Sequence, residues 1–157
     1  MSHAVEVQVD EPFQAQVQPD LLQQAALAVL AYQQAAEACE LAVVVTDDEA
    51  LRELNRRSRN MDASTDVLAF PNEARGPFVS APGHPRYLGD VIVSFPRAAA
   101  QAAEAEHTVE AELQLLVVHG VLHLLGYDDE VKQQRARMWK AQSAILQALG
   151  VQVHLPA

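Results

Sequence analysis

Hydrophobic residues recur along this chain in two patterns, short runs typical of strands and longer stripes typical of helices. Residues 5–9 alternate strictly between apolar and polar side chains, which indicates a half-buried strand. Residues 41–45 form a continuous apolar run rich in valine, as expected of a fully buried strand. Similar runs at 67–70, which Pro71 ends, and at 88–95 complete a set of four predicted strands.

Apolar stripes with helical spacing occupy most of the segments between and after these strands. Thr46 and Glu49 have the spacing of a capping box, so Thr46 is the predicted N-cap of a helix that ends near Arg59. The predicted helices cover residues 19–37, 47–59, 96–106, 109–125 and 130–149.

The order of these elements predicts the fold class. Strands that alternate with helices are typical of an α/β fold. We expect residues 1–157 to form a single domain, in which a small mixed, partly parallel four-stranded sheet packs against about five helices. Residues 72–87 contain several prolines and glycines and few apolar anchors, which predicts a long functional or mobile loop.

The composition restricts the classes of protein to which this chain can belong. Half of its 157 residues are hydrophobic, which suits one globular domain with a sizeable core. No apolar run is long enough to cross a bilayer, residues 1–15 lack the pattern of a signal peptide, and Cys39 is the only cysteine. We therefore expect a cytoplasmic protein with no membrane partner. The net charge of −10 argues against a surface that binds nucleic acid non-specifically.

Residues 119–129 carry the strongest indication of chemistry. His119 and His123 are four residues apart in an apolar helix, so both imidazoles project from one face and can reach one metal ion. Gly126 is placed to end the helix in a left-handed conformation, and Asp128 and Asp129 follow where a third ligand is needed. Three protein ligands leave one position open for water, which is the arrangement of a catalytic zinc.

Two further segments place polar residues beside a predicted strand. Arg59 is the last helical residue before a turn, where its guanidinium could bind two phosphate oxygens; pairing with Asp62 or Asp66 is the alternative role. Gly89 and Asp90 follow the start of the fourth strand. This pair indicates a close approach of another backbone and a carboxylate that is either structural or supports the metal ligands.

Together these motifs resemble the YbeY family of bacterial rRNA maturation factors, which are metal-dependent endoribonucleases. The resemblance spans about residues 50–130, and the His-Gly-x-Leu-His-Leu-x-Gly-Tyr-Asp pattern at 119–128 is its most specific part. It implies one α/β domain with a metal-binding helix similar to that of metalloproteases. It also implies a single-strand-specific endoribonuclease that acts in maturation of the small-subunit rRNA end and in ribosome quality control.

The resemblance assigns roles to particular residues. It implies that His119 and His123 bind zinc, that His119 is also catalytic, and that Arg59 is a catalytic and substrate-binding residue. The family usually has a third histidine where this chain has Asp129, but an aspartate oxygen is an acceptable zinc ligand. We expect one zinc ion per chain, held by His119, His123 and Asp129; a weaker site with the two histidines alone is the alternative.

Two other functions fit parts of the pattern. A zinc metallopeptidase has similar spacing, but such enzymes need a glutamate as general base directly after the first histidine, where this chain has Gly120. A ribosome-assembly factor with a mainly structural metal is the second alternative. The favoured mechanism is zinc-assisted phosphodiester hydrolysis, with Arg59 stabilising charge on the non-bridging oxygens. Expected partners are ribosomal RNA, the small ribosomal subunit and ribosome-associated proteins.

Overall fold

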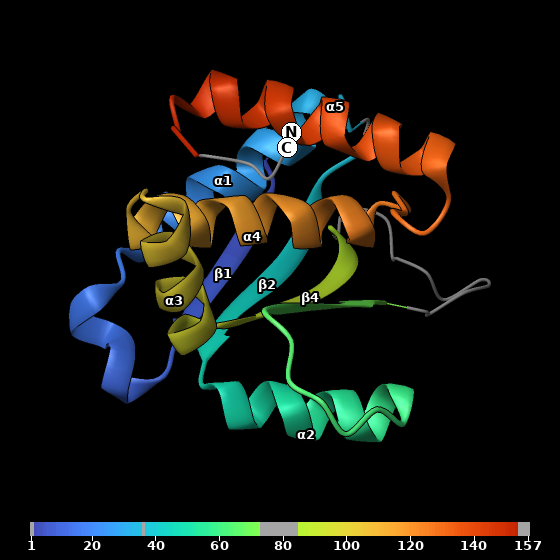
Figure 1. The fold of residues 1–157 in the computed structure, drawn as a ribbon. Helices are drawn as coiled ribbons and strands as arrows, with labels where there is room; N and C mark the ends of the chain where they lie inside the picture. The colour runs from blue at the N-terminus through green and yellow to red at the C-terminus, as the bar shows by residue number, and fades with distance from the viewer. Residues whose placement is uncertain (1, 36, 73–84, 154–157) are drawn as a thin grey trace.

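Four strands form one mixed sheet in the order β1-β2-β4-β3 (Figure 1). The first three strands in this order run parallel, and β3 pairs antiparallel with β4 at the edge. The strands are β1 (Ala4–Val9), β2 (Cys39–Thr46), β3 (Val67–Pro71) and β4 (Arg86–Ser94). This computed structural model describes residues 2–35, 37–72 and 85–153. The prediction of a small, partly parallel four-stranded sheet is confirmed.

Helices cover both faces of the sheet. Helices α1 and α4 pack on one face with α5 outside them, and α2 lies on the opposite face (Figure 1). The described helices are η1 (Glu11–Gln16, a 3-10 helix), α1 (Pro19–Tyr32), α2 (Asp48–Arg59), α3 (Phe95–Ala105), α4 (Val109–Leu124) and α5 (Lys132–Leu149). The expected number of about five helices is confirmed, and η1 was too short to give a periodic signal. None of the described helices is long and apolar enough to cross a membrane.

Valines of the central strands form the middle of the core. Val43 on β2 pairs in register with Val7 on β1 and with Val91 on β4, and both Val43 and Val91 are completely buried. Val43 and Val91 belong to one buried cluster with residues of α1 and α4, whereas Ala42 and Val44 alternate with Val43 and are only half-buried. The expectation of a fully buried second strand is therefore wrong for one face, because α2 contacts β3 and β4 and covers that face incompletely.

Helix α2 begins one residue later than the capping box predicts. The side chain of Asp47, rather than that of Thr46, accepts a hydrogen bond from the backbone N–H of Ala50, at 2.7 Å. Thr46 ends β2 instead, and its hydroxyl donates to the carboxylate of Asp10. Register with β4 extends β2 through Thr46, so pairing in the sheet decides this boundary.

Three other boundaries also differ from prediction. Helix α1 ends at Tyr32 rather than near residue 37, because Gln34 adopts a left-handed conformation with φ of 52°. Helix α5 begins at Lys132 rather than at residue 130. Strand β4 begins at Arg86, inside the predicted loop 72–87, because its first residues pair with the start of β2. Most of that loop lies outside the described residues.

The C-terminal end of α4 turns as the glycine predicts. Gly126 has a φ of +97°, a conformation that L side chains rarely adopt. The backbone N–H groups of Gly126 and Tyr127 donate to the carbonyl oxygens of His123 and Leu122, each at 3.0 Å, which is a Schellman motif. This turn brings the residues after the helix back over its last two turns.

Gly120 lets α4 lie unusually close to the sheet. A Cβ atom at this position would be 2.5 Å from Cγ1 of Val91 and 3.4 Å from Cγ2 of Val67. Contacts below about 3 Å do not occur for real Cβ atoms, so the approach of α4 to β3 and β4 depends on the missing side chain. Because His119 precedes Gly120 on α4, the same close packing determines the distance of His119 from the sheet.

Candidate metal centre

The structure brings His119, His123 and Asp129 together at the C-terminal end of α4. The Nε2 atoms of the two histidines are 3.1 Å apart. Oδ2 of Asp129 lies 3.8 Å from Nε2 of His119 and 4.0 Å from Nε2 of His123. The three side chains are 24%, 29% and 42% exposed in that order. Solvent therefore reaches a point on which three potential ligand atoms converge.

These separations fit a small tetrahedral ion. Zinc bonds of about 2.0–2.2 Å to nitrogen and oxygen place neighbouring ligand atoms about 3.4 Å apart. The two ring nitrogens are already near this spacing, and the carboxylate would need to move by about half an ångström. Two imidazoles and a carboxylate are a donor set that zinc and other divalent transition metals accept. The three side chains could thus hold a metal ion and leave one position open.

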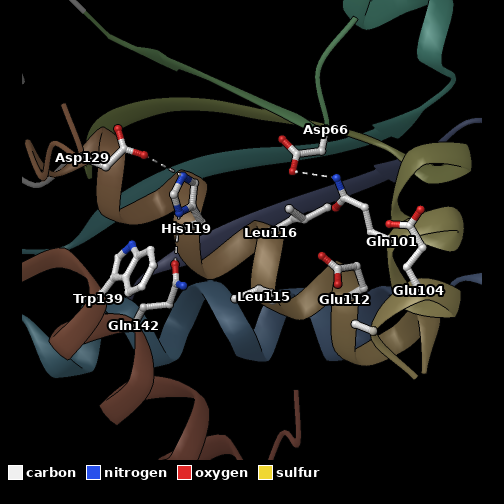
Figure 2. A pocket seen from close by; sticks show the side chains of 11 residues that line it. Asp66, Gln101, Glu104, Glu112, Leu115, Leu116, His119, Asp129, Trp139 and Gln142 are labelled. Carbon is white, nitrogen blue, oxygen red and sulfur yellow. Dashed lines mark hydrogen bonds and ion pairs between the residues drawn. The ribbon is translucent and has the colours of Figure 1, made fainter. Parts of the chain in front are cut away.

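A buried amide on α5 orients the ring of His119. Nδ1 of His119 lies 3.1 Å from Oε1 of Gln142, whose side chain is buried beneath the histidine (Figure 2). An amide oxygen only accepts hydrogen bonds, so this contact places the ring proton on Nδ1 and leaves the Nε2 lone pair facing His123 and Asp129. Burial, and then the neighbouring His123, lower the pKa of His119, which favours the neutral ring that a metal requires.

The turn that carries Asp129 is held by its own hydrogen bonds. The carboxylate of Asp128 accepts from the backbone N–H of Glu130 at 2.9 Å. The guanidinium of Arg135 donates to the backbone carbonyl of Asp129, also at 2.9 Å. Asp128 therefore stabilises the turn, while Asp129 is the aspartate whose carboxylate faces the histidines.

Arg59 and the three potential ligands line the same cavity. This cavity of about 720 Å³, here called the phosphate cavity, lies between the end of α2, the start of β3 and the end of α4. Its lining residues include Arg59, Thr65, Asp66, His119, His123, Tyr127, Asp128 and Asp129. Segments that are far apart in the sequence thus place a cationic residue in the same cavity as a potential metal site.

Neither of the carboxylates suggested as alternative partners for Arg59 binds it. Asp62 forms an ion pair with Arg52 at 2.8 Å. Asp66 accepts a hydrogen bond from Nε2 of Gln101 at 3.3 Å. Within residues 2–35, 37–72 and 85–153, no carboxylate lies within ion-pair distance of the Arg59 guanidinium. Its donors are therefore available to a ligand in the phosphate cavity.

A second cavity of about 580 Å³ adjoins the first and shares Asp66, His119 and Asp129 with it. We call it the side cavity. Figure 2 shows Gln101 and Glu104 of α3 at one end, Trp139 and Gln142 of α5 at the other, and residues of α4 between them. Its remaining lining residues are Ala105, Glu112, Leu115 and Leu116.

The pair Gly89 and Asp90 has a structural role. Gly89 has a φ of +137°, and a Cβ atom there would be 2.2 Å from the carbonyl oxygen of Phe70, which confirms the predicted close approach of a backbone. The carboxylate of Asp90 accepts a hydrogen bond from the hydroxyl of Tyr87. Burial and then Asp90 raise the pKa of Tyr87 to about 12. Asp90 thus belongs to the sheet rather than to the potential metal site.

Sequence reasoning did not find Gln142, Trp139 or Gln101. Gln142 and Trp139 lie on a helix whose apolar stripe was the only visible pattern, and Gln101 lies in an alanine-rich helix. A buried glutamine among apolar residues at 138, 141 and 145 was the one available signal, because buried amides are usually there to satisfy a partner. The identity of that partner depends on how α5 crosses α4.

Comparison with known proteins identifies relatives over almost the whole chain. The sequence profile of the family described as Endoribonuclease YbeY matches residues 5–150. A protein of Chloroflexus aurantiacus named Endoribonuclease YbeY is 46% identical over 153 residues, covering 96% of this chain and 98% of the relative. A Roseiflexus protein of the same name is 45% identical over 149 residues, covering 94% of this chain and 93% of the relative.

A solved structure supports the fold independently. The solution structure of a protein from Thermotoga maritima superposes with a TM-score of 0.55. It covers 94% of this chain and 91% of that protein at 23% sequence identity. At this identity the similarity shows only that the two proteins share their arrangement of strands and helices.

Proposed function

Because this chain belongs to the YbeY family of endoribonucleases, we propose that it is a metal-dependent endoribonuclease acting on single-stranded RNA through His119, His123 and Asp129. The observation that carries this proposal is the phosphate cavity, which Arg59 lines together with the three potential metal ligands. A phosphodiester is an anion whose charge increases during cleavage, so a guanidinium opposite a metal ion is suited to it.

The side chains have separate tasks in this reaction. When bound, a zinc or similar ion would act as a Lewis acid and lower the pKa of a coordinated water. His119, His123 and Asp129 would hold that ion, with His119 kept in the required tautomer by Gln142. Arg59 would bind the non-bridging oxygens of the scissile phosphate and stabilise their developing charge.

The cellular role in this proposal is maturation of the small-subunit rRNA end and ribosome quality control. One zinc ion per chain, action in the cytoplasm, and contact with the small ribosomal subunit or its associated proteins belong to the same proposal. The chain has a net charge of −10, so a long basic track for RNA is not what holds the substrate. The ribosome or a bound protein would then present the RNA to this small site.

Peptidase activity fits the geometry poorly. The peptidase general base would have to stand at position 120, directly after His119. A side chain starting there would begin 2.5 Å from Val91 inside the helix–sheet interface. Core side chains therefore fill the space that a glutamate side chain at position 120 would need.

Parallel assays on RNA and on protein test the proposal. The purified chain, loaded with zinc, is incubated with a labelled single-stranded RNA, with the same sequence in a duplex, and with casein. We expect cleavage of the single-stranded RNA that a chelator abolishes and added zinc restores. His123→Ala should lose both bound metal, measured by elemental analysis, and RNA cleavage.

Each other result has a definite meaning. Cleavage of casein that His119→Ala abolishes would replace the nuclease proposal with a peptidase. RNA binding with a stoichiometric metal but no cleavage under any metal tested would favour an assembly factor with a structural metal. A chain that binds no transition metal on titration would contradict the metal site itself.

A further inference from the structure

The side cavity continues directly from the potential metal site but differs from it in chemistry. The phosphate cavity contains Arg59, whereas no lysine or arginine lines the side cavity in the described part of the chain. Its charged lining residues are the acids Asp66, Glu104, Glu112 and Asp129. No lysine or arginine of the lining would neutralise a phosphate group there, so the cavity suits a different part of an RNA chain.

An aromatic ring and an apolar floor give this cavity the features of a base-binding site. Trp139, the only tryptophan in the chain, is 46% exposed. Its side chain lines the cavity beside Gln142 and His119 (Figure 2). Leu115 and Leu116 of α4 form the apolar floor. Proteins commonly recognise single-stranded RNA by stacking unpaired bases on such exposed aromatic side chains.

We propose that the side cavity binds one nucleobase, stacked on Trp139, next to the phosphodiester held between Arg59 and the metal centre. The inference rests on the proposed function, because it assigns a subsite to an RNA substrate. The two cavities share His119 and Asp129, so a base and its own phosphate can occupy them together. A cavity of about 580 Å³ is large enough for one base.

The side cavity offers a base a stacking surface rather than a set of base-specific hydrogen bonds. Gln101 and Glu104 lie at the opposite end of the cavity from Trp139, so a base stacked on Trp139 does not reach them (Figure 2). Every base has a π-face, so stacking on Trp139 accepts cytosine and uracil alike.

The single tryptophan makes binding measurable without reference to activity. Zinc-loaded protein is titrated with 2′-O-methyl hexamers of cytidine, of uridine, or of abasic residues, while a gel checks that the hexamers stay intact. We expect the cytidine and the uridine hexamer both to quench the fluorescence of Trp139 saturably and with similar affinities, because stacking is tolerant of base identity. The abasic hexamer should leave the fluorescence unchanged.

Cleavage kinetics with unmodified cytidine and uridine hexamers then test stacking through variants of Trp139. Trp139→Ala should raise KM roughly fivefold or more for both hexamers, whereas Trp139→Phe, which retains a stacking face, should stay near wild type. Tyr32→Ala removes an equally exposed aromatic ring outside both cavities and should change neither KM value.

The failure of this inference differs from the failure of the proposed function. If the wild type cleaves both hexamers and neither hexamer changes the fluorescence of Trp139, the base subsite is wrong and the nuclease stands. If the wild type cleaves no RNA, the proposed function is wrong whatever the fluorescence shows. Equal losses in Trp139→Phe and Trp139→Ala would also overturn stacking as the basis of binding.

Discussion

Arg59 differs from its neighbours on α2 in its freedom to bind a ligand. Arg56 and Arg57 both form ion pairs with Glu53, at 2.6 and 2.9 Å. Hydrogen bonds from Arg56 and then Arg57 lower the pKa of Glu53 to about 2. These partners neutralise each other on an exposed face of the helix, whereas Arg59 lines the phosphate cavity.

A comparison of two neighbouring arginines tests this distinction. Arg59→Ala should lower the rate of RNA cleavage by roughly a hundredfold or more, with Arg59→Lys in between, because a transition-state donor is lost or made less directional. Zinc content and melting temperature should stay near wild type. Arg57→Ala is the matched control and should keep nearly full activity, since its partner is Glu53. Destabilised Arg59→Ala protein that is fully active per folded molecule would contradict the role of Arg59.

Gln142 acts through His119 rather than on a substrate. Gln142→Leu keeps the volume of the side chain approximately but removes the acceptor for Nδ1 of His119. Loss of such an orienting partner typically weakens metal binding by about 10–100-fold. We expect this loss in a zinc titration monitored by a competing chelator. Gln147→Leu, an exposed change on the same helix, should bind zinc as the wild type does; equal affinities for all three proteins would refute the positioning role.

At the scale of elements, the site depends on how closely α4 approaches the sheet. Gly120 is buried against Val91, which has no exposed surface. Glycine in a helix interior normally costs about 1 kcal/mol relative to alanine. Here the close packing of α4 on β4 offsets that cost, because any side chain would separate the two elements.

Gly120→Ala should therefore destabilise the protein despite the higher helix propensity of alanine. Overpacking of a core costs about 1–3 kcal/mol, from which the gain in propensity subtracts at most about 1 kcal/mol. Chemical denaturation should show a net loss. In Gly120→Ala/Val91→Ala the valine methyl groups are gone, so the loss should be smaller than the sum of the two single variants. Strict additivity would show that the clash with Val91 is not the cause.

At the scale of the whole molecule, one carboxylate connects elements from different layers. Asp48, in the first turn of α2, accepts hydrogen bonds from Ser64 before β3, from Ser94 at the end of β4, and from Arg97 on α3. Hydrogen bonds from Arg97, and next from Ser64, hold the pKa of Asp48 below its usual range. The charged carboxylate is thus favoured in the folded state.

The pH dependence of stability tests this connection. A carboxyl group whose folded pKa is lowered stabilises the protein above its unfolded pKa of about 3.9, and this contribution is lost as the pH falls through the folded value. Asp48→Asn should lower the free energy of unfolding at pH 7 by about 1 kcal/mol, since the ion pair is partly exposed. The difference from wild type should shrink below about pH 4. A difference that is the same at pH 7 and at pH 3 would contradict a role for the charge.

The sequence determined the features that depend on local spacing. Periodicity located the four strands and five α-helices found in the described part of the chain, because apolar residues must repeat with the period of the element that buries them. The spacing of His119 and His123 placed both imidazoles on one helix face, and Gly126 ended that helix, because both properties follow from the geometry of a single helix. The family followed from the same local motifs.

Tertiary structure alone decided what depends on elements that meet from distant parts of the chain. The N-cap of α2 is Asp47 rather than the predicted Thr46, because Thr46 pairs with β4 in the sheet. The orienting contact of Gln142 with His119 and the side cavity beside Trp139 exist only where α5 crosses α4. Spacing along a sequence fixes directions within one element, but the distance between two elements is set by how their side chains pack.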